Sequence, residues 1–149
     1  MSHPPALIDA ALVTGAVGYR LRRAHFRFVE AWQRRFAALG LPIAPMQGGM
    51  LVLIGANPGI SQGELMRLLG VEGSTMVQAI ARLVALGLIA RRRSAEDRRR
   101  FALRLTPRGE EARALIMAHL KAHEEAVLAG FTAEERETLR QLLGRICGV

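Results

Sequence analysis

Residues 57–109 read NPGISQGELMRLLGVEGSTMVQAIARLVALGLIARRRSAEDRRRFALRLTPRG, and the order of patterns in this stretch decides the fold. Ser61, followed by Glu64 three residues later, is a capping box, which predicts the start of a helix that ends at Gly70. A second helical pattern follows over 73–86, where apolar residues recur at helical spacing. Two short helices joined by a tight, glycine-containing turn are typical of a helix-turn-helix.

After the second helix the apolar period changes from helical to alternating. Phe101, Leu103 and Leu105 alternate with small or charged residues. This alternation predicts a two-stranded hairpin with RRRSAEDRRR, residues 91–100, at its tip. Pro107 then opens a long helix, because proline is favoured at the first helical position.

Helical patterns flank this stretch on both sides. An apolar stripe at helical spacing runs from about residue 7 to residue 39 and ends at Gly40. A short buried helix is expected over 45–56, and two more helices are expected after the hairpin, at about 107–129 and 132–146. We therefore predict a mainly α fold with a small β-hairpin.

Positive charge is concentrated in the middle of the chain. The 149 residues carry a formal net charge of +8, and residues 61–108 hold ten basic and four acidic side chains. Residues 109–149 hold five basic and seven acidic side chains, so the end of the chain is acidic. Eight arginines lie between positions 91 and 108. This distribution predicts a polyanion-binding surface, and nucleic acid is the leading candidate.

The sequence also predicts the cellular compartment of the protein. The single cysteine, Cys147, excludes an intrachain disulfide and favours a reducing interior. The apolar stretch at 6–19 contains Asp9 and lacks a preceding positive region, so it matches neither a signal peptide nor a membrane span. We expect a cytoplasmic protein without a membrane partner.

Taken together, these motifs resemble the MarR family of winged-helix transcriptional regulators. In that family the runs L-S-x-x-E-L, G-V-x-x-S-T, L-x-x-x-G-L-I/V, D-x-R and L-T-x-x-G recur in this order, and the matching residues here lie within 57–109. The resemblance spans essentially the whole chain. It implies a single domain over 1–149, with a winged helix-turn-helix DNA-binding lobe at about 45–106 and a helical dimerisation lobe built from about 7–40 and 107–149.

The same resemblance implies a function. Members of the family are homodimers in which each subunit places a recognition helix in the major groove and a wing in the minor groove of double-stranded DNA. Many are repressors that small anionic or phenolic ligands release. We therefore expect a homodimeric repressor on a pseudo-palindromic operator, with an aromatic acid or an acyl-CoA thioester as its small-molecule effector.

The second helix of the helix-turn-helix is the predicted recognition helix. Hydroxyl groups near its N-terminus suit phosphate oxygens or base edges. Gln78 can bond adenine through both side-chain atoms, and Arg82 is better placed for a backbone phosphate. Relatives often carry polar side chains where this chain has Gly73 and Val77, so we expect specificity to depend partly on DNA shape. The predicted contacts of this helix are Ser74, Thr75, Gln78 and Arg82.

The predicted wing supplies a second set of contacts. By the D-x-R pattern of the family, Asp97 would orient Arg99 into the minor groove, where a narrow A·T-rich groove attracts a guanidinium group. The neighbouring arginines would straddle adjacent phosphates. Outside the recognition helix, the predicted DNA-binding residues are Ser61, Gln62, Arg93, Asp97, Arg98, Arg99 and Arg100.

A ligand pocket is suggested by Gly48 and Gly49 in the buried helix at 45–56, where relatives usually place bulkier side chains. We expect the missing side chains to leave a cavity or to let a ligand approach the backbone closely. Arginine and aromatic groups on the first helix favour an anionic aromatic ligand. The same residues also fit a dimer interface and protein core, and this alternative stays open. The predicted lining is Tyr19, Arg22, Arg23, Phe26, Trp32, Met46, Gly48, Gly49 and Met50.

Two other functions stay open from the sequence. The weakly polar recognition helix would also suit a sequence-tolerant architectural DNA-binding protein without an effector. His119 and His123, four residues apart, have a spacing that can bind zinc in a metal-sensing regulator, although no third ligand is evident and we expect a solvated helix face. We predict no cofactor and no metal site. No catalytic motif is present in the sequence, so we expect no enzymatic activity.

Overall fold

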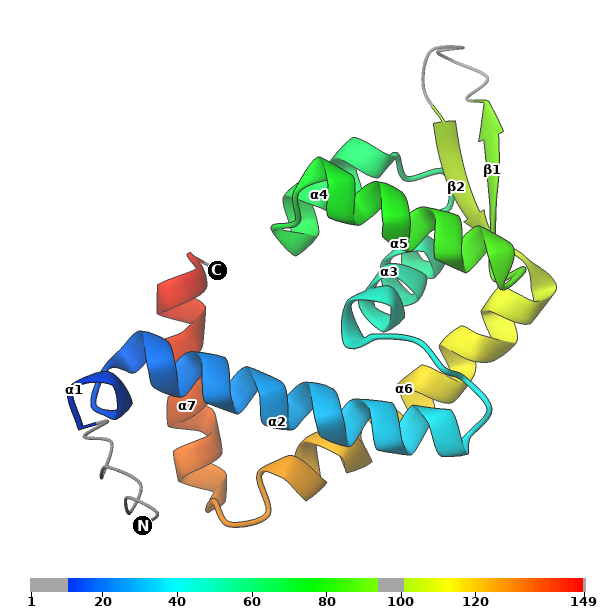
Figure 1. The fold of residues 1–149 in the computed structure, drawn as a ribbon. Helices are drawn as coiled ribbons and strands as arrows, with labels where there is room; N and C mark the ends of the chain where they lie inside the picture. The colour runs from blue at the N-terminus through cyan, green and yellow to red at the C-terminus, as the bar shows by residue number, and fades with distance from the viewer. Residues whose placement is uncertain (1–10, 94–100, 149) are drawn as a thin grey trace, which may run out of the picture.

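The computed structural model describes residues 11–93 and 101–148, which form seven helices and one two-stranded sheet. The predicted mainly α fold with a small β-hairpin is confirmed. In chain order the elements are α1 (Ala11–Thr14), α2 (Val17–Ala38), α3 (Pro45–Ala56), α4 (Gln62–Leu69), α5 (Gly73–Ala85), β1 (Ile89–Arg93), β2 (Phe101–Leu105), α6 (Pro107–Val127) and α7 (Ala133–Cys147) (Figure 1).

The first helix differs from its prediction. A continuous helix was expected from about residue 7 to residue 39, but α1 and α2 are separated at Gly15 and Ala16. The amide of Ala16 donates a hydrogen bond to the Val13 carbonyl at 3.1 Å, which closes α1 with a tight turn. Apolar periodicity continues across this break, whereas a helix-interior glycine costs about 1 kcal/mol relative to alanine. The stripe therefore missed the interruption and overstated the buried face, because only Trp32 and Phe36 of α2 are buried while Phe26 is exposed.

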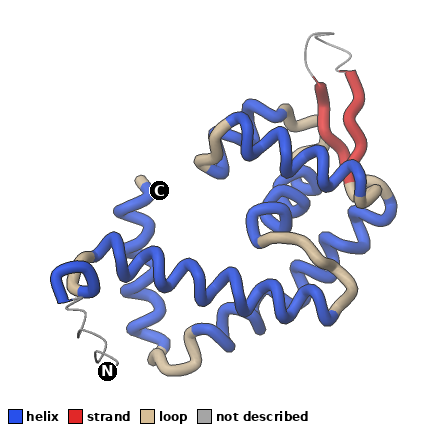
Figure 2. Tube along the Cα trace, in the orientation of Figure 1, coloured by secondary structure: helices blue, strands red, loops and turns tan. Residues whose placement is uncertain are grey.

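The helices form two lobes that α6 joins. In Figures 1 and 2, α3, α4, α5 and the hairpin lie together, and α2 and α7 lie apart from them. Helix α6 starts beside the hairpin and packs against both α3 and α2. One hydrophobic core therefore links the two lobes, and its fully buried members include Phe36, Met50, Leu83, Leu103 and Ile116.

Helix α3 lies within this shared core. Pro45 occupies its first turn, and the side-chain oxygen of Gln47 accepts a hydrogen bond from the Ala44 amide at 3.0 Å. Met50 and Leu51 have no exposed surface. Within residues 11–93 and 101–148, no single helix is both long and apolar enough to cross a membrane. Helices α4 and α5 reach that length and composition only as a pair, across a bend of 116°.

Strands β1 and β2 form the predicted antiparallel hairpin. Ile89 pairs with Leu105 at its base, and the buried Ile89 and Leu103 show that one face packs on the core. The chain before α4 adds a short edge to β2: the Gly59 amide donates to the Leu103 carbonyl at 2.9 Å, and the Leu103 amide donates to the Ile60 carbonyl at 3.0 Å. Gly59 has a φ of +100°, a left-handed conformation that favours glycine.

A compact junction ties α5, the hairpin and α6 together. The Thr106 hydroxyl donates to the Gly87 carbonyl at 2.6 Å and accepts from the Gly109 amide at 3.0 Å. The Thr106 amide donates to the Leu88 carbonyl at 3.1 Å. Gly109 approaches this backbone so closely that a Cβ atom on it would lie 1.9 Å from the Leu88 carbonyl oxygen. Only glycine fits there without displacing the backbone.

We predict that Gly109→Ala lowers the free energy of unfolding by roughly 1–3 kcal/mol, because the added methyl group meets backbone rather than a movable side chain. The matched control is Gly63→Ala in α4, where nothing lies within 4 Å of the Cβ position. That change should leave stability unchanged or raise it by up to about 1 kcal/mol. Urea unfolding followed by circular dichroism, at one fixed protein concentration, measures both. Equal midpoints for Gly109→Ala and the wild type would contradict the role given to this junction.

Candidate nucleic-acid interface

Helix α5 exposes the face that the sequence predicts for DNA contact. Its buried side carries Met76, Ala79, Ile80 and Leu83. The exposed side carries Ser74, Thr75, Gln78 and Arg82. Of these, Thr75, Gln78 and Arg82 share one line of the helix surface, because residues three and four apart are neighbours there. The N-cap residue is Glu72, so Ser74 lies inside the helix and is not its cap.

Two valines extend this exposed face. Val77 is 53% exposed and Val84 is 42% exposed, although both are large apolar side chains. An apolar side chain presented to a major groove can contact the methyl group of thymine. From the sequence, Val77 was expected only as a departure from the family pattern. Its spacing of three residues from Ser74 was the signal that places it on the exposed side.

The start of α4 is held by its own cap. The Ser61 hydroxyl donates to a Glu64 carboxylate oxygen at 2.7 Å, and the Ser61 amide donates to the same oxygen at 2.8 Å. The Glu64 amide in turn donates to the Ser61 hydroxyl at 3.3 Å. In this cap the Ser61 hydroxyl bonds to Glu64, and the DNA contact expected of Ser61 stays a prediction. Gln62, the first helical residue, is half-buried beside it.

The described part of the wing is strongly cationic. Arg91, Arg92 and Arg93 are all exposed along β1. The Arg91 guanidinium lies over the ring of Phe101, 4.5 Å from its centroid, which is a cation–π contact across the hairpin. Residues 94–100 lie outside the described residues, and the roles expected for four of them stay predictions: Asp97, Arg98, Arg99 and Arg100.

Two other arginines of the charged segment have separate surroundings. Arg108 donates a hydrogen bond to the carbonyl of Leu86, the C-cap residue of α5, at 2.9 Å. It therefore stabilises the end of the recognition helix. Arg104 lies exposed on β2, and its Nη2 atom is 4.0 Å from the Cβ position of Gly59. In the sequence both arginines belong to the charge of the wing, and the alternation over 101–105 separates Arg104 from the core-facing leucines.

The prediction of a cavity beside Gly48 is wrong. A Cβ atom on Gly48 would lie 2.4 Å from the ring of Trp32, so the indole fills the space that the missing side chain leaves. Trp32 is held there by a hydrogen bond from its Nε1 atom to the Ile43 carbonyl at 3.0 Å and by stacking on Phe36. A Cβ atom on Gly49 would make ordinary van der Waals contact with Leu69, at 3.7 Å. These glycines serve core packing in this structure.

The predicted ligand residues divide into two groups. Trp32, Gly48 and Met50 are buried, and Met46 packs partly buried against the same core. Arg22, Arg23 and Phe26 are exposed on the first half of α2, where Tyr19 is half-buried. Because a helix rises 1.5 Å per residue, Tyr19 and Trp32 lie about 20 Å apart along α2. The structure therefore does not bring the nine residues into one pocket.

His123 is not on the solvated helix face that the sequence predicted. It is 4% exposed, and its ring packs edge-on against Trp32 at 5.5 Å and Phe28 at 5.9 Å between centroids. Burial lowers the pKa of His123 below its usual 6.5, the charge of Arg35 lowers it further, and Glu124 opposes both. The Nδ1 atom of His123 is buried and has no hydrogen-bond partner among the described residues.

His119 and His123 line one open groove of about 480 Å³ together with Arg34 and Arg35. Two guanidinium groups beside the imidazoles repel a divalent cation. Among residues 11–93 and 101–148 there is also no cluster of three or more His, Cys, Asp or Glu residues that could hold a metal ion. The described geometry thus gives the zinc-sensing alternative no support.

The exposed α5, the α4–α5 turn and the cationic hairpin define a winged helix-turn-helix DNA-binding protein. The profile of the MarR family matches residues 39–100. The putative transcriptional regulatory protein for the hcr operon of Thauera aromatica is 34% identical over 134 residues, which cover 90% of this chain and 80% of that protein. The chain belongs to the MarR family of transcriptional regulators.

Solved structures extend this likeness over the whole fold. The transcriptional repressor CouR bound to a 23-mer DNA duplex has a TM-score of 0.82 at 29% identity, covering 95% of this chain and 99% of that chain. CouR bound to p-coumaroyl-CoA has a TM-score of 0.84 at 27% identity, covering 95% and 98%. Both lobes of the fold, and not the DNA-binding lobe alone, are therefore similar to those of CouR.

The lowered pKa of His123 predicts a loss of stability in acid. The unfolded chain takes up a proton near pH 6.5, whereas the folded chain does so only at lower pH, so the free energy of unfolding should fall as the pH drops below about 6.5. His123→Leu should flatten this decline, because it removes the titrating group. His119→Leu, which removes a partly exposed histidine of the same helix, is the control and should keep it. Melting temperatures between about pH 7.5 and 5.5 give the comparison. An unchanged decline in His123→Leu would contradict the assignment.

Proposed function

We propose that this protein is a sequence-specific, double-stranded-DNA-binding repressor that a small anionic or aromatic ligand releases from its operator. It would bind as a homodimer to a pseudo-palindromic site, with α5 of each subunit in a major groove and each hairpin in the adjacent minor groove. One observation carries the proposal: the exposed polar face of α5 lies beside an arginine-rich hairpin, on a fold similar to that of CouR, whose structure was solved on DNA.

The exposed residues of α5 would make different kinds of contact with DNA. Gln78 has both a donor and an acceptor for an adenine edge, which gives it the most sequence information of the exposed set. Ser74 and Thr75, close to the N-terminus of α5, suit phosphate oxygens, and Arg82 suits a phosphate further along the helix. Val77 would add an apolar contact. Few side chains would then read bases directly, so DNA shape would contribute to selectivity.

Uncovered apolar side chains support the homodimer. No residue of α7 is buried, although Leu142, Leu143 and Ile146 are large and apolar. Val17 and Leu21 near the start of α2 are exposed as well, and one apolar groove between α2, α6 and α7 includes both Leu21 and Leu143. A second copy of the chain would cover this surface, because a two-fold interface uses the same residues from both subunits.

The effector proposal rests on chemistry at the first half of α2. There the Arg22 guanidinium lies 5.5 Å from the ring centroid of Phe26, with Arg23 and Tyr19 nearby in the sequence. An exposed aromatic ring among arginines suits an anionic aromatic group. The complex of CouR with p-coumaroyl-CoA supports the same chemical class. The ligand would release DNA by binding better to a dimer whose recognition helices are not one helical turn apart.

The test of DNA recognition compares the DNA upstream of the protein's own gene with a scrambled duplex of equal length. The wild type should bind the upstream DNA at least about 10³-fold more tightly. Affinity should fall by about 10³–10⁵ between roughly 50 and 200 mM salt if the dimer neutralises six to ten phosphates. Equal affinity for the two duplexes would favour the architectural alternative over a specific regulator.

In the same assay Gln78→Ala should weaken operator binding by about 1–3 kcal/mol per half-site and leave binding to the scrambled duplex unchanged. Gln33→Ala, at an exposed position of α2 in the other lobe, is the matched control and should behave as the wild type. Parallel losses on both duplexes would show that Gln78 does not read bases.

For the effector, p-coumaroyl-CoA is expected to lower the affinity of the wild type for its operator, while coenzyme A alone is not. Arg22→Ala together with Phe26→Ala should reduce this response without changing DNA affinity in the absence of ligand, because both side chains are exposed on α2, away from α5. Fluorescence anisotropy of a labelled operator duplex gives both quantities. A full response in the double variant would remove these two residues from the effector site.

A further inference from the structure

The outward face of the hairpin carries two arginines and two alanines in a diagonal arrangement. Ala90 pairs with Arg104, and Arg92 pairs with Ala102. Directly opposite residues of an antiparallel pair share a face, as do residues two apart on one strand, so these four side chains lie on the same side. The alternate residues Ile89 and Leu103 are buried against the core, so the Arg92 and Arg104 side faces away from it.

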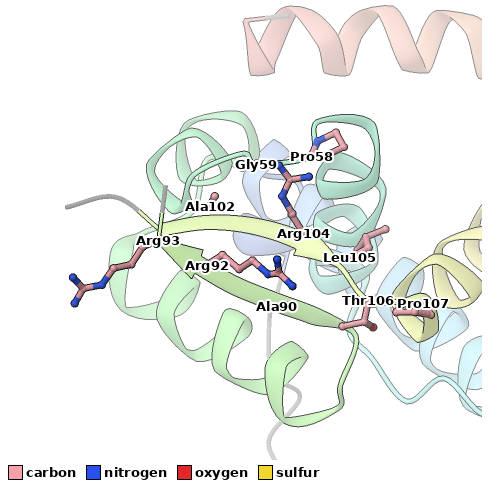
Figure 3. Close-up of a pocket in the computed structure, with 10 residues that line it drawn as sticks. All are labelled: Pro58, Gly59, Ala90, Arg92, Arg93, Ala102, Arg104, Leu105, Thr106 and Pro107. Carbon is pink, nitrogen blue, oxygen red and sulfur yellow. The ribbon is translucent and has the colours of Figure 1, made fainter. Parts of the chain in front are cut away.

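This outward face is hollowed into an open groove of about 740 Å³. Figure 3 shows Arg92 and Arg104 rising from the two strands into it, while Arg93 points away from them at the end of β1. Ala90 and Ala102 line the groove between the two arginines. Because the alanine side chains are short, the backbone of a polyanion can come close to the sheet between the two guanidinium groups.

The charged residues that line the groove are all cationic. They are Arg92, Arg93 and Arg104, and the other lining residues are uncharged. Among the ion pairs of residues 11–93 and 101–148, none involves these three arginines. Arg104 extends over Gly59, where its Nη2 atom lies 4.0 Å from the Cβ position, and the positive φ of Gly59 disfavours a side chain there. The surface is thus shaped and charged for a phosphate-bearing partner.

The form of the groove favours the backbone of a nucleic acid over a small ligand. Small-molecule sites enclose most of their ligand and have an apolar lining with a few polar anchors. Here Arg92 and Arg104 are exposed on two paired strands. A row of exposed cations binds a polyanion by releasing its counterions, which needs no enclosure.

The direction of the groove indicates which part of the DNA it would meet. Helix α5 packs against β1 and α3 packs against β2, both toward the buried face of the hairpin. The Arg92 and Arg104 face is therefore turned away from the recognition helix. With α5 in a major groove and the hairpin in the adjacent minor groove, this face looks outward along the DNA, beyond the half-site that α5 reads.

We propose that Arg92 and Arg104 bind the phosphodiester backbone of the DNA that flanks the operator, on the outer side of each wing. This inference rests on the proposed function, because it takes the placement of α5 and the hairpin on DNA from it. The two arginines lengthen the footprint and add affinity without adding base contacts, since phosphates carry no sequence information. A two-fold dimer places four such guanidinium groups on DNA.

The experiment compares two duplexes that contain the same upstream operator. One ends at the outer edge of the half-sites, and the other is extended by roughly one helical turn, about 10 base pairs, at each end. The wild type should bind the extended duplex at least about tenfold more tightly and with a steeper salt dependence. Arg92→Ala with Arg104→Ala should lose this gain and lower the logarithmic salt slope on the extended duplex by up to about 3.6, or 0.9 for each of four lost contacts. Binding to the short duplex should stay as in the wild type.

Two further variants sharpen the test. Arg20→Ala with Arg27→Ala removes the same charge from exposed positions of α2 in the other lobe and should keep the flank-dependent gain. Arg92→Lys with Arg104→Lys keeps both charges and should retain most of the gain, while melting temperatures equal to the wild type show that each variant is folded. A double alanine variant that keeps the full gain and slope overturns the proposal and leaves the proposed function intact. A wild type that prefers neither operator duplex to a scrambled one overturns both.

Discussion

The arrangement of α5, the hairpin and α6 depends on the close approach of Gly109 to the backbone of Leu88. No side chain fits between them, because a Cβ atom on Gly109 would lie 1.9 Å from the Leu88 carbonyl oxygen. Thr106 bonds to Gly87 and Leu88 and also caps α6, so the end of α5, the base of the hairpin and the start of α6 form one unit. Helix α6 shares the hydrophobic core with α2, so this unit is packed directly against the helical lobe.

The hairpin places neighbouring arginines of the charged segment in different surroundings. Successive residues of a strand point to opposite faces, so consecutive arginines of β1 cannot all serve one contact. Arg91 stacks on Phe101, whereas Arg92 shares the outward groove with Arg104. Arg108, which ends the same charged segment, bonds to the last turn of α5 instead. Net charge alone therefore overstates how much of the segment can meet DNA from one side.

The surroundings of Trp32 show that tertiary packing can change what a sequence pattern predicts. Two adjacent glycines in a buried helix suggested a void, but the indole of Trp32 occupies the space beside Gly48. His123 looked solvated from its charged neighbours, but it is packed against Trp32 and Phe28. Both differences come from the packing of α2 against α3, the next helix in the chain, and against α6, which is distant in sequence. Apolar residues at helical spacing indicate which face of a helix is buried, but they do not indicate which side chain fills a gap in the core.

The sequence by itself determined the order of elements, the buried faces of α4 and α5, the capping box at Ser61 and Glu64, and the hairpin. It also predicted the exposed set on α5 that includes Gln78 and Arg82. These features depend on local backbone preference and on periodicity, which residues a few positions apart decide. Only the tertiary structure decided the position of Trp32 against Gly48, the burial of His123 and the shared groove of Arg92 and Arg104. Most of these depend on contacts between segments far apart in the chain, which no local pattern records.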